Sequence, residues 1–214
     1  MKDTTKQLEE KINLLEKKIR EKNEEIKKLC SVANCDVLTS LYNRRGFLME
    51  IDKVLEEIAN RKERQEKRKI IFEDFALIFI DLDDLKKIND TNGHEVGDQA
   101  LVKAAQLFKS SVRKFDIVAR WGGDEFVIGL LGVDIAMATN IVENIRKKLQ
   151  LLKAGGQKLS ASFGVVDMTE YCSKHDKKCD IEKLIDKADK AMYKAKKELD
   201  KNTVVVFNES FYKD

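Results

Sequence analysis

Hydrophobic positions near the start of the chain recur in alternating steps of four and three residues over about four heptads. The series is Leu8, Ile12, Leu15, Ile19, Ile26, Leu29 and Ala33, with Lys22 at one seam position and charged residues filling nearly all the positions between. This spacing is typical of the a/d seam of a coiled coil. A single exposed amphipathic helix is the alternative, but so narrow an apolar stripe has little to bury it except a partner helix. We therefore expect a coiled-coil helix over residues 1–34, paired through residues 5–34 in a parallel homodimer.

The rest of the chain alternates between helical and strand patterns. Helices are predicted over about 44–67, 86–90, 96–112, 135–152 and 181–199, and strands over 75–82, 117–120, 125–131, 159–166 and 203–207. Gly122 and Gly123 separate two apolar runs, which indicates a hairpin. We expect residues 35–214 to form one α/β domain of the α+β sandwich type. Its centre would be a mainly antiparallel sheet of about five strands, covered by helices.

Composition narrows the class of protein. The 214 residues are 43% hydrophobic and 37% charged, with no proline, which excludes wholesale disorder and allows long helices. The longest apolar run, Phe75–Ile80, is far shorter than the roughly 20 residues of a membrane-spanning helix. The charged N-terminus lacks an apolar signal core, and four cysteines are too few for a disulfide scaffold. We therefore expect a cytoplasmic protein with no membrane segment. The net charge of +3 gives no indication of a nucleic-acid partner.

Acidic residues cluster where the first predicted strand ends. Asp81 and Asp83 close this strand, where neighbouring carboxylates repel one another unless a cation compensates. Hard oxygen ligands of this kind suit Mg²⁺ or Mn²⁺. Asp124 and Glu125 add two carboxylates at the hairpin, and such a cluster can hold two cations about 3.5–4 Å apart for nucleotidyl transfer. There is an alternative for each pair of acids. Asp81 and Asp83 could cap the following helix, and Asp124 and Glu125 could belong to a plain Gly-Gly-Asp turn.

Five segments, in order, resemble the motifs of the GGDEF-type diguanylate cyclases. They are Asp36–Arg45, Asp81–Asp98, Gly122–Phe126, Ser160–Gly164 and Ala188–Lys196. The resemblance extends over about 36–207 and implies a fold like the nucleotidyl cyclase and polymerase palm. It also implies a reaction in which two GTP molecules condense into cyclic di-GMP and two pyrophosphates, each 3′-hydroxyl attacking the α-phosphate of the other GTP. Two domains must then face each other, in agreement with the predicted coiled coil.

The resemblance assigns roles residue by residue. Two Mg²⁺ or Mn²⁺ ions per active site would be held by Asp81, Asp124 and the Leu82 carbonyl. Asp124 is the family's usual proton acceptor, Glu125 assists it, and Lys86 neutralises phosphate charge. The substrate-binding set comprises Asn89 and Asp98 for the guanine edge, His94, Gly122, Gly123, and Lys196 for the terminal phosphate. Arg113 and Asp116 resemble the inhibitory product site, at which cyclic di-GMP would act by feedback.

The sequence departs from the family pattern in places. Leu85 stands where the family usually has phenylalanine, and Asp84 where it often has an aromatic residue or histidine. Lys201 replaces an arginine after the last helix, which could loosen triphosphate anchoring. A loop with Cys172, His175 and Cys179 is better explained as a plain insertion than as a zinc site.

The main alternative to an active cyclase is a non-catalytic module that binds GTP or cyclic di-GMP as a signalling receptor. A scaffold that acts only through its coiled coil is a further one. An upstream sensor domain or a partner would supply the input, which the sequence does not name.

Overall fold

The computed structural model describes residues 11, 15–22, 33–64, 74–167 and 180–212. Most of the predicted coiled coil lies outside these residues, as does the loop with Cys172, His175 and Cys179. Residues 15–22 are helical, and the side chains of the predicted seam residues Leu15 and Ile19 are 50% and 58% exposed. None of the described helices is long and apolar enough to cross a membrane.

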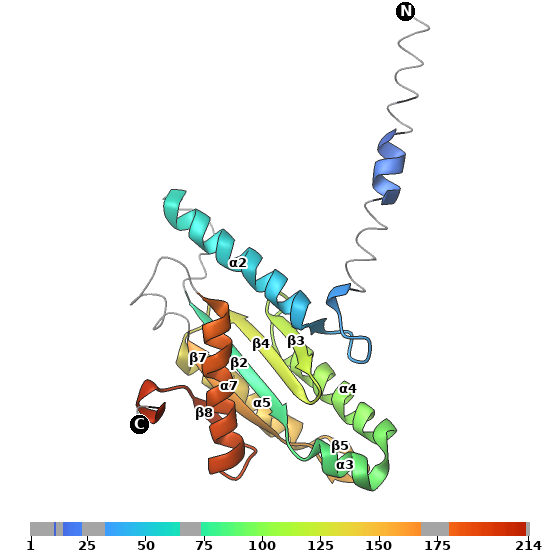
Figure 1. Cartoon of the computed structure of the whole chain (residues 1–214), viewed down its shortest axis with the longest axis vertical. Helices are drawn as coiled ribbons and strands as arrows, with labels where there is room; N and C mark the ends of the chain where they lie inside the picture. The colour runs from blue at the N-terminus through green and yellow to red at the C-terminus, as the bar shows by residue number, and fades with distance from the viewer. Residues whose placement is uncertain (1–10, 12–14, 23–32, 65–73, 168–179, 213–214) are drawn as a thin grey trace, which may run out of the picture.

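The described chain contains a six-stranded mixed sheet with helices on both faces (Figure 1). Its strands are β1 (Tyr42–Asn43), β2 (Phe75–Leu82), β3 (Ile117–Gly122), β4 (Glu125–Leu131), β7 (Ala161–Asp167) and β8 (Val204–Val206), in the order β1-β3-β4-β2-β7-β8. The four central strands pair antiparallel, whereas β1 and β8 pair in parallel at the two edges. The helices are α2 (Arg44–Arg64), α3 (Leu85–Asn92), α4 (His94–Ser111), α5 (Ile135–Leu149) and α7 (Ile181–Glu198), followed by the 3-10 turn η1 (Glu209–Tyr212). The predicted α+β sandwich is confirmed, with one strand more than expected.

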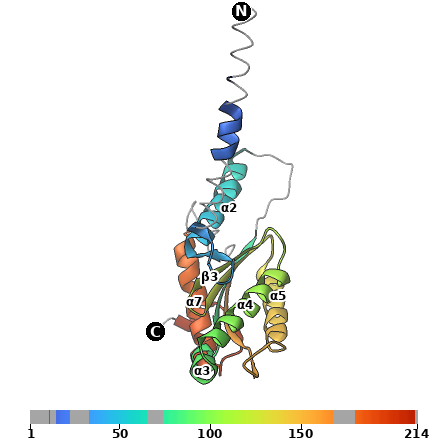
Figure 2. The same ribbon diagram turned by 90° about the vertical axis from the view of Figure 1, so that its right-hand side faces the viewer.

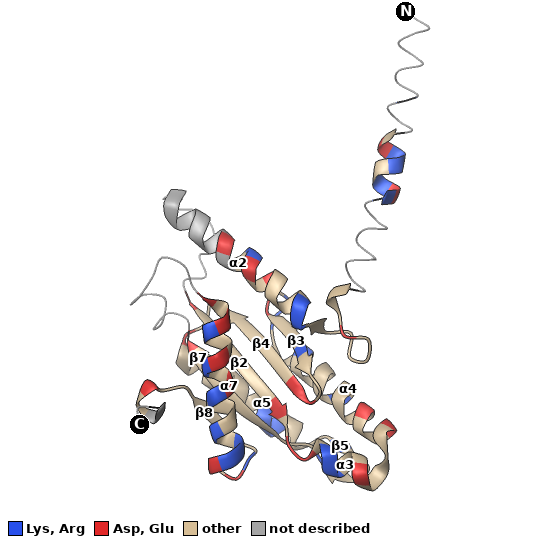
Figure 3. Cartoon of the chain, in the orientation of Figure 1, with Lys and Arg blue, Asp and Glu red and all other residues tan. Residues whose placement is uncertain are grey.

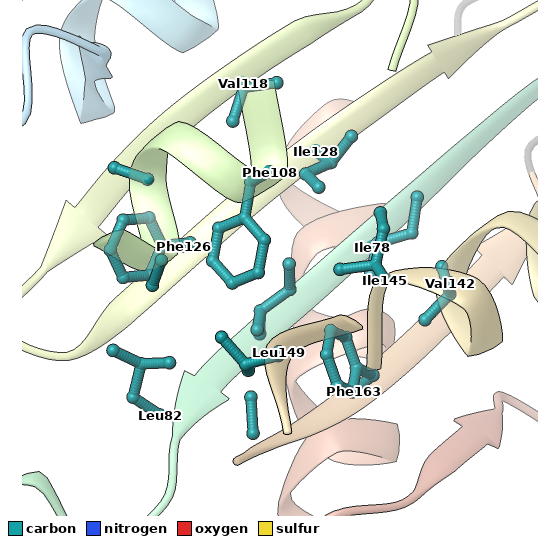
Figure 4. Close-up of a cluster of buried hydrophobic side chains, with 14 of the residues drawn as sticks. Ile78, Leu82, Phe108, Val118, Phe126, Ile128, Val142, Ile145, Leu149 and Phe163 are labelled. Carbon is teal, nitrogen blue, oxygen red and sulfur yellow. The ribbon is translucent and has the colours of Figure 1, made fainter. Parts of the chain in front are cut away.

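Strand β2 is buried along its whole length because it has a helical layer on each side (Figure 2). Ala76, Ile78 and Ile80 pack with the side chains of α3, α4 and α5. The alternate residues Phe75, Leu77 and Phe79 pack with α2 and α7. Figure 4 shows part of the first cluster, where Phe108 of α4 meets Phe126 of β4 edge to face with ring centroids 5.1 Å apart. A strand covered on both faces shows a continuous apolar run, which explains the sequence pattern.

Three short strands were not predicted. Strand β1 has two residues, and β5 (Lys153–Ala154) and β6 (Gln157–Lys158) form a separate two-stranded hairpin. This hairpin contacts α4, where the Lys103 ammonium donates to the Lys153 carbonyl over 2.7 Å. Its turn packs against Asn92 at Gly155, where a Cβ would come within 2.6 Å of that side chain. Strands of two residues are too short to show a period of two, so they leave no signal in the sequence.

Helix α7 is capped by Asp180, whose side chain accepts from the N–H groups of Glu182 and Lys183. The helix then crosses β7 so closely that Gly164 has no room for a side chain. A Cβ there would collide with the backbone of α7 at the Ala188 carbonyl and the Met192 nitrogen. The absence of a side chain at Gly164 therefore sets how near α7 comes to the sheet.

Replacing Gly164 with alanine should destabilise the fold, because backbone atoms cannot move aside as a side chain can. We expect Gly164→Ala to lower the free energy of unfolding by about 3 kcal/mol. Gly129→Ala is the matched control in β4, since a Cβ there would meet only the side chains of Phe75 and Ile51, at 3.0 and 3.1 Å. Its loss should be about 1 kcal/mol. Urea unfolding of both variants would test this, and equal losses would contradict the explanation.

Candidate active site

The acidic residues of two strands meet at one end of the central sheet. Asp81, near the end of β2, pairs in register with Glu125, the first residue of β4. The main-chain N–H of Leu82 donates to the Asp124 carbonyl over 3.1 Å. Figure 3 shows these acidic strand ends beside the basic C-terminal part of α7. The structure thus brings together the carboxylates that the sequence placed about 43 residues apart along the chain.

Asp81 lies on the same face of β2 as Leu77 and Phe79, the face that packs against α2 and α7. Asp81 is only 5% exposed. Its carboxylate accepts a 2.6 Å hydrogen bond from the ammonium of Lys196 on α7. Burial raises the pKa of Asp81 to about 6, and the charges of Asp124 and Asp83 act in the same direction, while Lys196 partly offsets them. The two residues predicted to hold a metal and a terminal phosphate therefore form an ion pair with each other.

Glu125 belongs to the same electrostatic cluster. Burial raises its pKa, and the charges of Asp81, Asp189 and Asp124 raise it further. Asp189 lies on α7, and burial followed by the charge of Asp186 raises its own pKa. The sequence singled out Asp189 only as part of a motif, because nothing in its position on the helix shows that it approaches the hairpin.

The acidic edge offers oxygen ligands for a divalent cation. Within the described residues no group of three or more His, Cys, Asp and Glu side chains is arranged to hold a metal. The expected ligands are two carboxylates, from Asp81 and Asp124, and the main-chain carbonyl of Leu82. Such a set suits Mg²⁺, which usually takes one or two carboxylates and completes its shell with water and substrate phosphates. Burial and mutual repulsion of these acids also favour a bound cation.

The Gly122–Gly123 turn is linked through Arg120 to Asp36, which lies in the segment before α2. The Arg120 guanidinium donates to the Gly123 carbonyl over 2.7 and 3.0 Å and to both carboxylate oxygens of Asp36 over 3.2 Å. Burial alone would raise the pKa of Asp36, but hydrogen bonds from Thr39 and the charge of Arg120 lower it below its usual value. Gly123 has a φ of 38°, which disfavours any other residue there. A cavity of about 410 Å³ beside this turn is lined in part by Arg44 and Arg45.

The predicted guanine-reading residues lie at the corner between α3 and α4. Gly93, with a φ of 85°, turns the chain, and its N–H donates to the Asn89 carbonyl over 2.8 Å. His94 and Asp98 lie in the first turns of α4, and their side chains are exposed. Lys86, in the first turn of α3, is also exposed. The two helices that follow β2 thus carry all four predicted residues: Lys86 and Asn89 lie on α3, and His94 and Asp98 lie on α4.

The turn after α7 is hydrogen-bonded to Asp83 and Asp84, which follow the end of β2. Asp83 is buried, and its carboxylate accepts from the Ser162 hydroxyl over 2.9 Å and from the Asn202 N–H over 3.0 Å. Lys201 donates to Asp84 over 2.8 Å, and this hydrogen bond raises the pKa of Lys201. The two departures from the family pattern at 84 and 201 are therefore partners. Leu85, the third departure, is buried in the core beside α4.

The sequence profile "Diguanylate cyclase, GGDEF domain" matches residues 33–202, most of the chain. The chain belongs to this GGDEF domain family. It is 38% identical over 141 residues to the "Probable diguanylate cyclase DgcJ" of Escherichia coli K12, covering 66% of this chain and 26% of DgcJ. It is 33% identical over 165 residues to the diguanylate cyclase DgcM of the same organism, covering 77% of this chain and 36% of DgcM. The chain thus spans about a quarter to a third of these relatives' length.

Solved GGDEF structures have the same fold. The coiled coil and GGDEF domain of DgcB from Caulobacter crescentus, in complex with c-di-GMP, superposes with a TM-score of 0.72 at 22% identity. The match covers 93% of this chain and 98% of the DgcB chain. The arrangement of strands and helices is therefore the one found in GGDEF domains, as the sequence motifs implied.

Arg113 and Asp116 of the GGDEF domain lie between α4 and β3. Asp116 is buried, and its two carboxylate oxygens accept from the main-chain N–H groups of Arg113, over 2.7 Å, and Leu131, over 3.1 Å. The Arg113 guanidinium lies 5.8 Å from the centre of the Phe115 ring, and the side chain is exposed. Asp116 therefore shapes the turn, whereas Arg113 is available to a ligand.

The raised pKa of Asp81 predicts a pH dependence of stability. Between about pH 4 and pH 6 the folded protein keeps the Asp81 proton that the unfolded chain has lost, so stability falls as pH rises through this window. Asp81→Asn removes this fall. In the presence of a chelator, the variant should gain on the order of 2–3 kcal/mol relative to the wild type from pH 4 to pH 7.

Excess Mg²⁺ should then stabilise the wild-type GGDEF domain at pH 7 but not Asp81→Asn, because only the wild type retains the ligand set. Thermal unfolding across the pH range, with and without Mg²⁺, measures both effects. Parallel pH profiles for the two proteins would show that Asp81 has an ordinary pKa.

Proposed function

We propose that this GGDEF domain is a diguanylate cyclase, which condenses two GTP molecules into cyclic di-GMP and two pyrophosphates. The observation that carries the proposal is the in-register pairing of Asp81 with Glu125, beside Asp124, at one end of the sheet. Raised pKa values for Asp81 and Glu125 mark this edge as a place where negative charge is crowded and desolvated. Membership of the GGDEF family and similarity to named diguanylate cyclases support it.

Asp81, Asp124 and the Leu82 carbonyl would hold two Mg²⁺ or Mn²⁺ ions, which supply charge neutralisation at the α-phosphate and a lower pKa for the attacking 3′-hydroxyl. Asp124 or Glu125 would accept the proton from this hydroxyl. The raised pKa of Glu125 makes its carboxylate a stronger proton acceptor than an ordinary glutamate. The pyrophosphate leaves with its charge neutralised by Lys86 and Lys196.

Lys196 must exchange partners when substrate binds. The Lys196 side chain is 26% exposed and its ammonium donates to Asp81, so the ammonium can turn toward a phosphate without entering the core. A cation bound to the Asp81 carboxylate would leave the Lys196 ammonium free to pair with the terminal phosphate. Binding of metal and of triphosphate are therefore expected to favour each other.

Condensing two GTP molecules requires two domains that face each other, since each contributes one substrate. The exposed seam residues Leu15 and Ile19 support pairing through the N-terminal helix, as the heptad pattern predicts. A parallel pair of N-terminal helices would hold two GGDEF domains near each other. An upstream sensor domain or a partner would then control how often the two active sites face each other.

Removing the Asp124 carboxylate should abolish product formation. We expect Asp124→Ala to reduce synthesis of cyclic di-GMP from GTP and Mg²⁺ at least about 100-fold while the protein stays folded. Glu50→Ala, which removes a half-buried carboxylate of α2 that pairs with Lys53 of the same helix, is the matched control and should keep full activity. Chromatography of the nucleotide products provides the measurement. If the wild type binds GTP or cyclic di-GMP but forms no product, the chain is instead a signalling receptor.

Feedback by cyclic di-GMP should depend on Arg113. Arg113→Ala is expected to raise the half-inhibitory concentration of added product at least about tenfold, with unchanged stability, because the guanidinium is exposed. Asp116→Ala should differ, since losing the acceptor of two main-chain N–H groups costs about 2 kcal/mol of stability. Inhibition curves and urea unfolding separate the two effects, and unchanged inhibition of Arg113→Ala would reject the role.

A further inference from the structure

Helix α4 carries a glycine one turn from its start, at Gly97. The residue is buried, and a Cβ there would collide with the side-chain oxygen Oδ1 of Asn89 on α3. The remaining amide atoms of Asn89 would also be close, with Nδ2 at 3.3 Å. The side chain of Asn89 therefore occupies the space that any other residue at 97 would need.

Two features of this contact, the glycine and the buried amide oxygen, lower the stability of the folded protein. Glycine inside a helix is less favourable than alanine. The Oδ1 atom of Asn89 is buried without a hydrogen-bond partner among the described residues, which is also unfavourable. Such local conflicts, when they coincide, commonly mark a site retained for function.

The backbone on both sides of the contact is fixed. The Gly97 N–H donates to the Gly93 carbonyl over 3.4 Å, and the Gly93 N–H donates to the Asn89 carbonyl over 2.8 Å. Ala100 and Leu101, just beyond Gly97, are buried in the core. Because neither helix can retreat, a methyl group at 97 would displace the Asn89 side chain, which is the part free to rotate.

We propose that Gly97 is a positioning residue for nucleotide recognition, which holds the amide plane of Asn89 by leaving room for it. The inference rests on the proposed function, in which Asn89 and the neighbouring Asp98 recognise guanine. A base with the guanine pattern of donors and acceptors requires the amide in one orientation, and a rotated amide loses that selectivity. Gly97 itself makes no contact with the base and acts only through Asn89.

The test is a double-mutant cycle of Gly97→Ala and Asn89→Ala in the full-length chain. The probes are 3′-deoxy-GTP and 3′-deoxy-ATP, which lack the attacking hydroxyl and so bind without turnover. Calorimetry gives the dissociation constant for each, and their ratio measures guanine selectivity. Steady-state assays with GTP add KM and kcat, and thermal unfolding reports stability.

We expect Gly97→Ala and Asn89→Ala each to reduce guanine selectivity about tenfold. The double variant should match Asn89→Ala within about twofold, because Gly97 acts through the side chain already removed. Gly97→Ala should raise the KM for GTP and change kcat by less than about twofold. Its melting temperature should stay the same or rise, since the variant gains helix propensity.

A glycine needed only for packing would instead lower the melting temperature and leave selectivity unchanged, and this would overturn the inference. Selectivity losses that multiply in the double variant would also overturn it. A wild-type chain that binds 3′-deoxy-GTP no better than 3′-deoxy-ATP would overturn the proposed guanine recognition and this inference with it. Failure of the inference alone therefore requires a selective wild type together with one of two results: a Gly97→Ala variant that is equally selective, or selectivity losses that multiply in the double variant.

Discussion

The burial of β2 on both faces is the constraint on which the candidate site depends. Its apolar residues alternate between the layer of α2 and α7 and the layer of α3, α4 and α5, so a shift by one residue would move each set of side chains into the layer packed for the other set. Asp81 continues this alternation at the end of the strand, which places a carboxylate beneath α7. Its raised pKa follows directly from that burial. The core thus determines where the crowded negative charge lies.

Three ion pairs lie around this negative charge, and they differ in how exposed their side chains are. The difference in exposure indicates different roles for these pairs. Lys201 and Asp84 are 39% and 55% exposed, so their pair contributes little stability and exchanges readily for another partner. Lys196 and the nearly buried Asp81 are more strongly coupled. Arg120 and Asp36 are 16% and 22% exposed, and Arg120 also holds the Gly123 carbonyl. The first two pairs suit exchange with ligands, whereas the third suits a fixed support for the hairpin turn.

The sequence predicted those parts of the fold whose pattern is local. The apolar run of β2, the glycine turn between β3 and β4 and the periodic helices all appear within a few residues of their predicted bounds. Strand β1 was not predicted, because two residues carry no period. Strand β8 was predicted, but its parallel pairing was not, because the pattern of a strand does not show which strand it pairs with. The contact of Asp36 with Arg120 joins positions 84 residues apart, and that of Asn89 with Gly97 depends on a helix corner. Neither leaves a local signal.

Unfavourable backbone conformations also gather around the acidic edge. Among the described residues five that are not glycine have positive φ, and four of these are Asp84, Asp200, Lys201 and Asn202. Each costs on the order of 1–3 kcal/mol unless neighbouring contacts hold it in place. Asp83 supplies such contacts through Ser162 and Asn202, and Arg146 adds a hydrogen bond to the Asn202 carbonyl over 3.2 Å. The stability of the doubly covered sheet therefore offsets backbone strain, buried charge and a buried Asn89 oxygen that has no hydrogen-bond partner in the described part of the chain. Such a concentration of local costs is expected where selection has favoured ligand binding over stability.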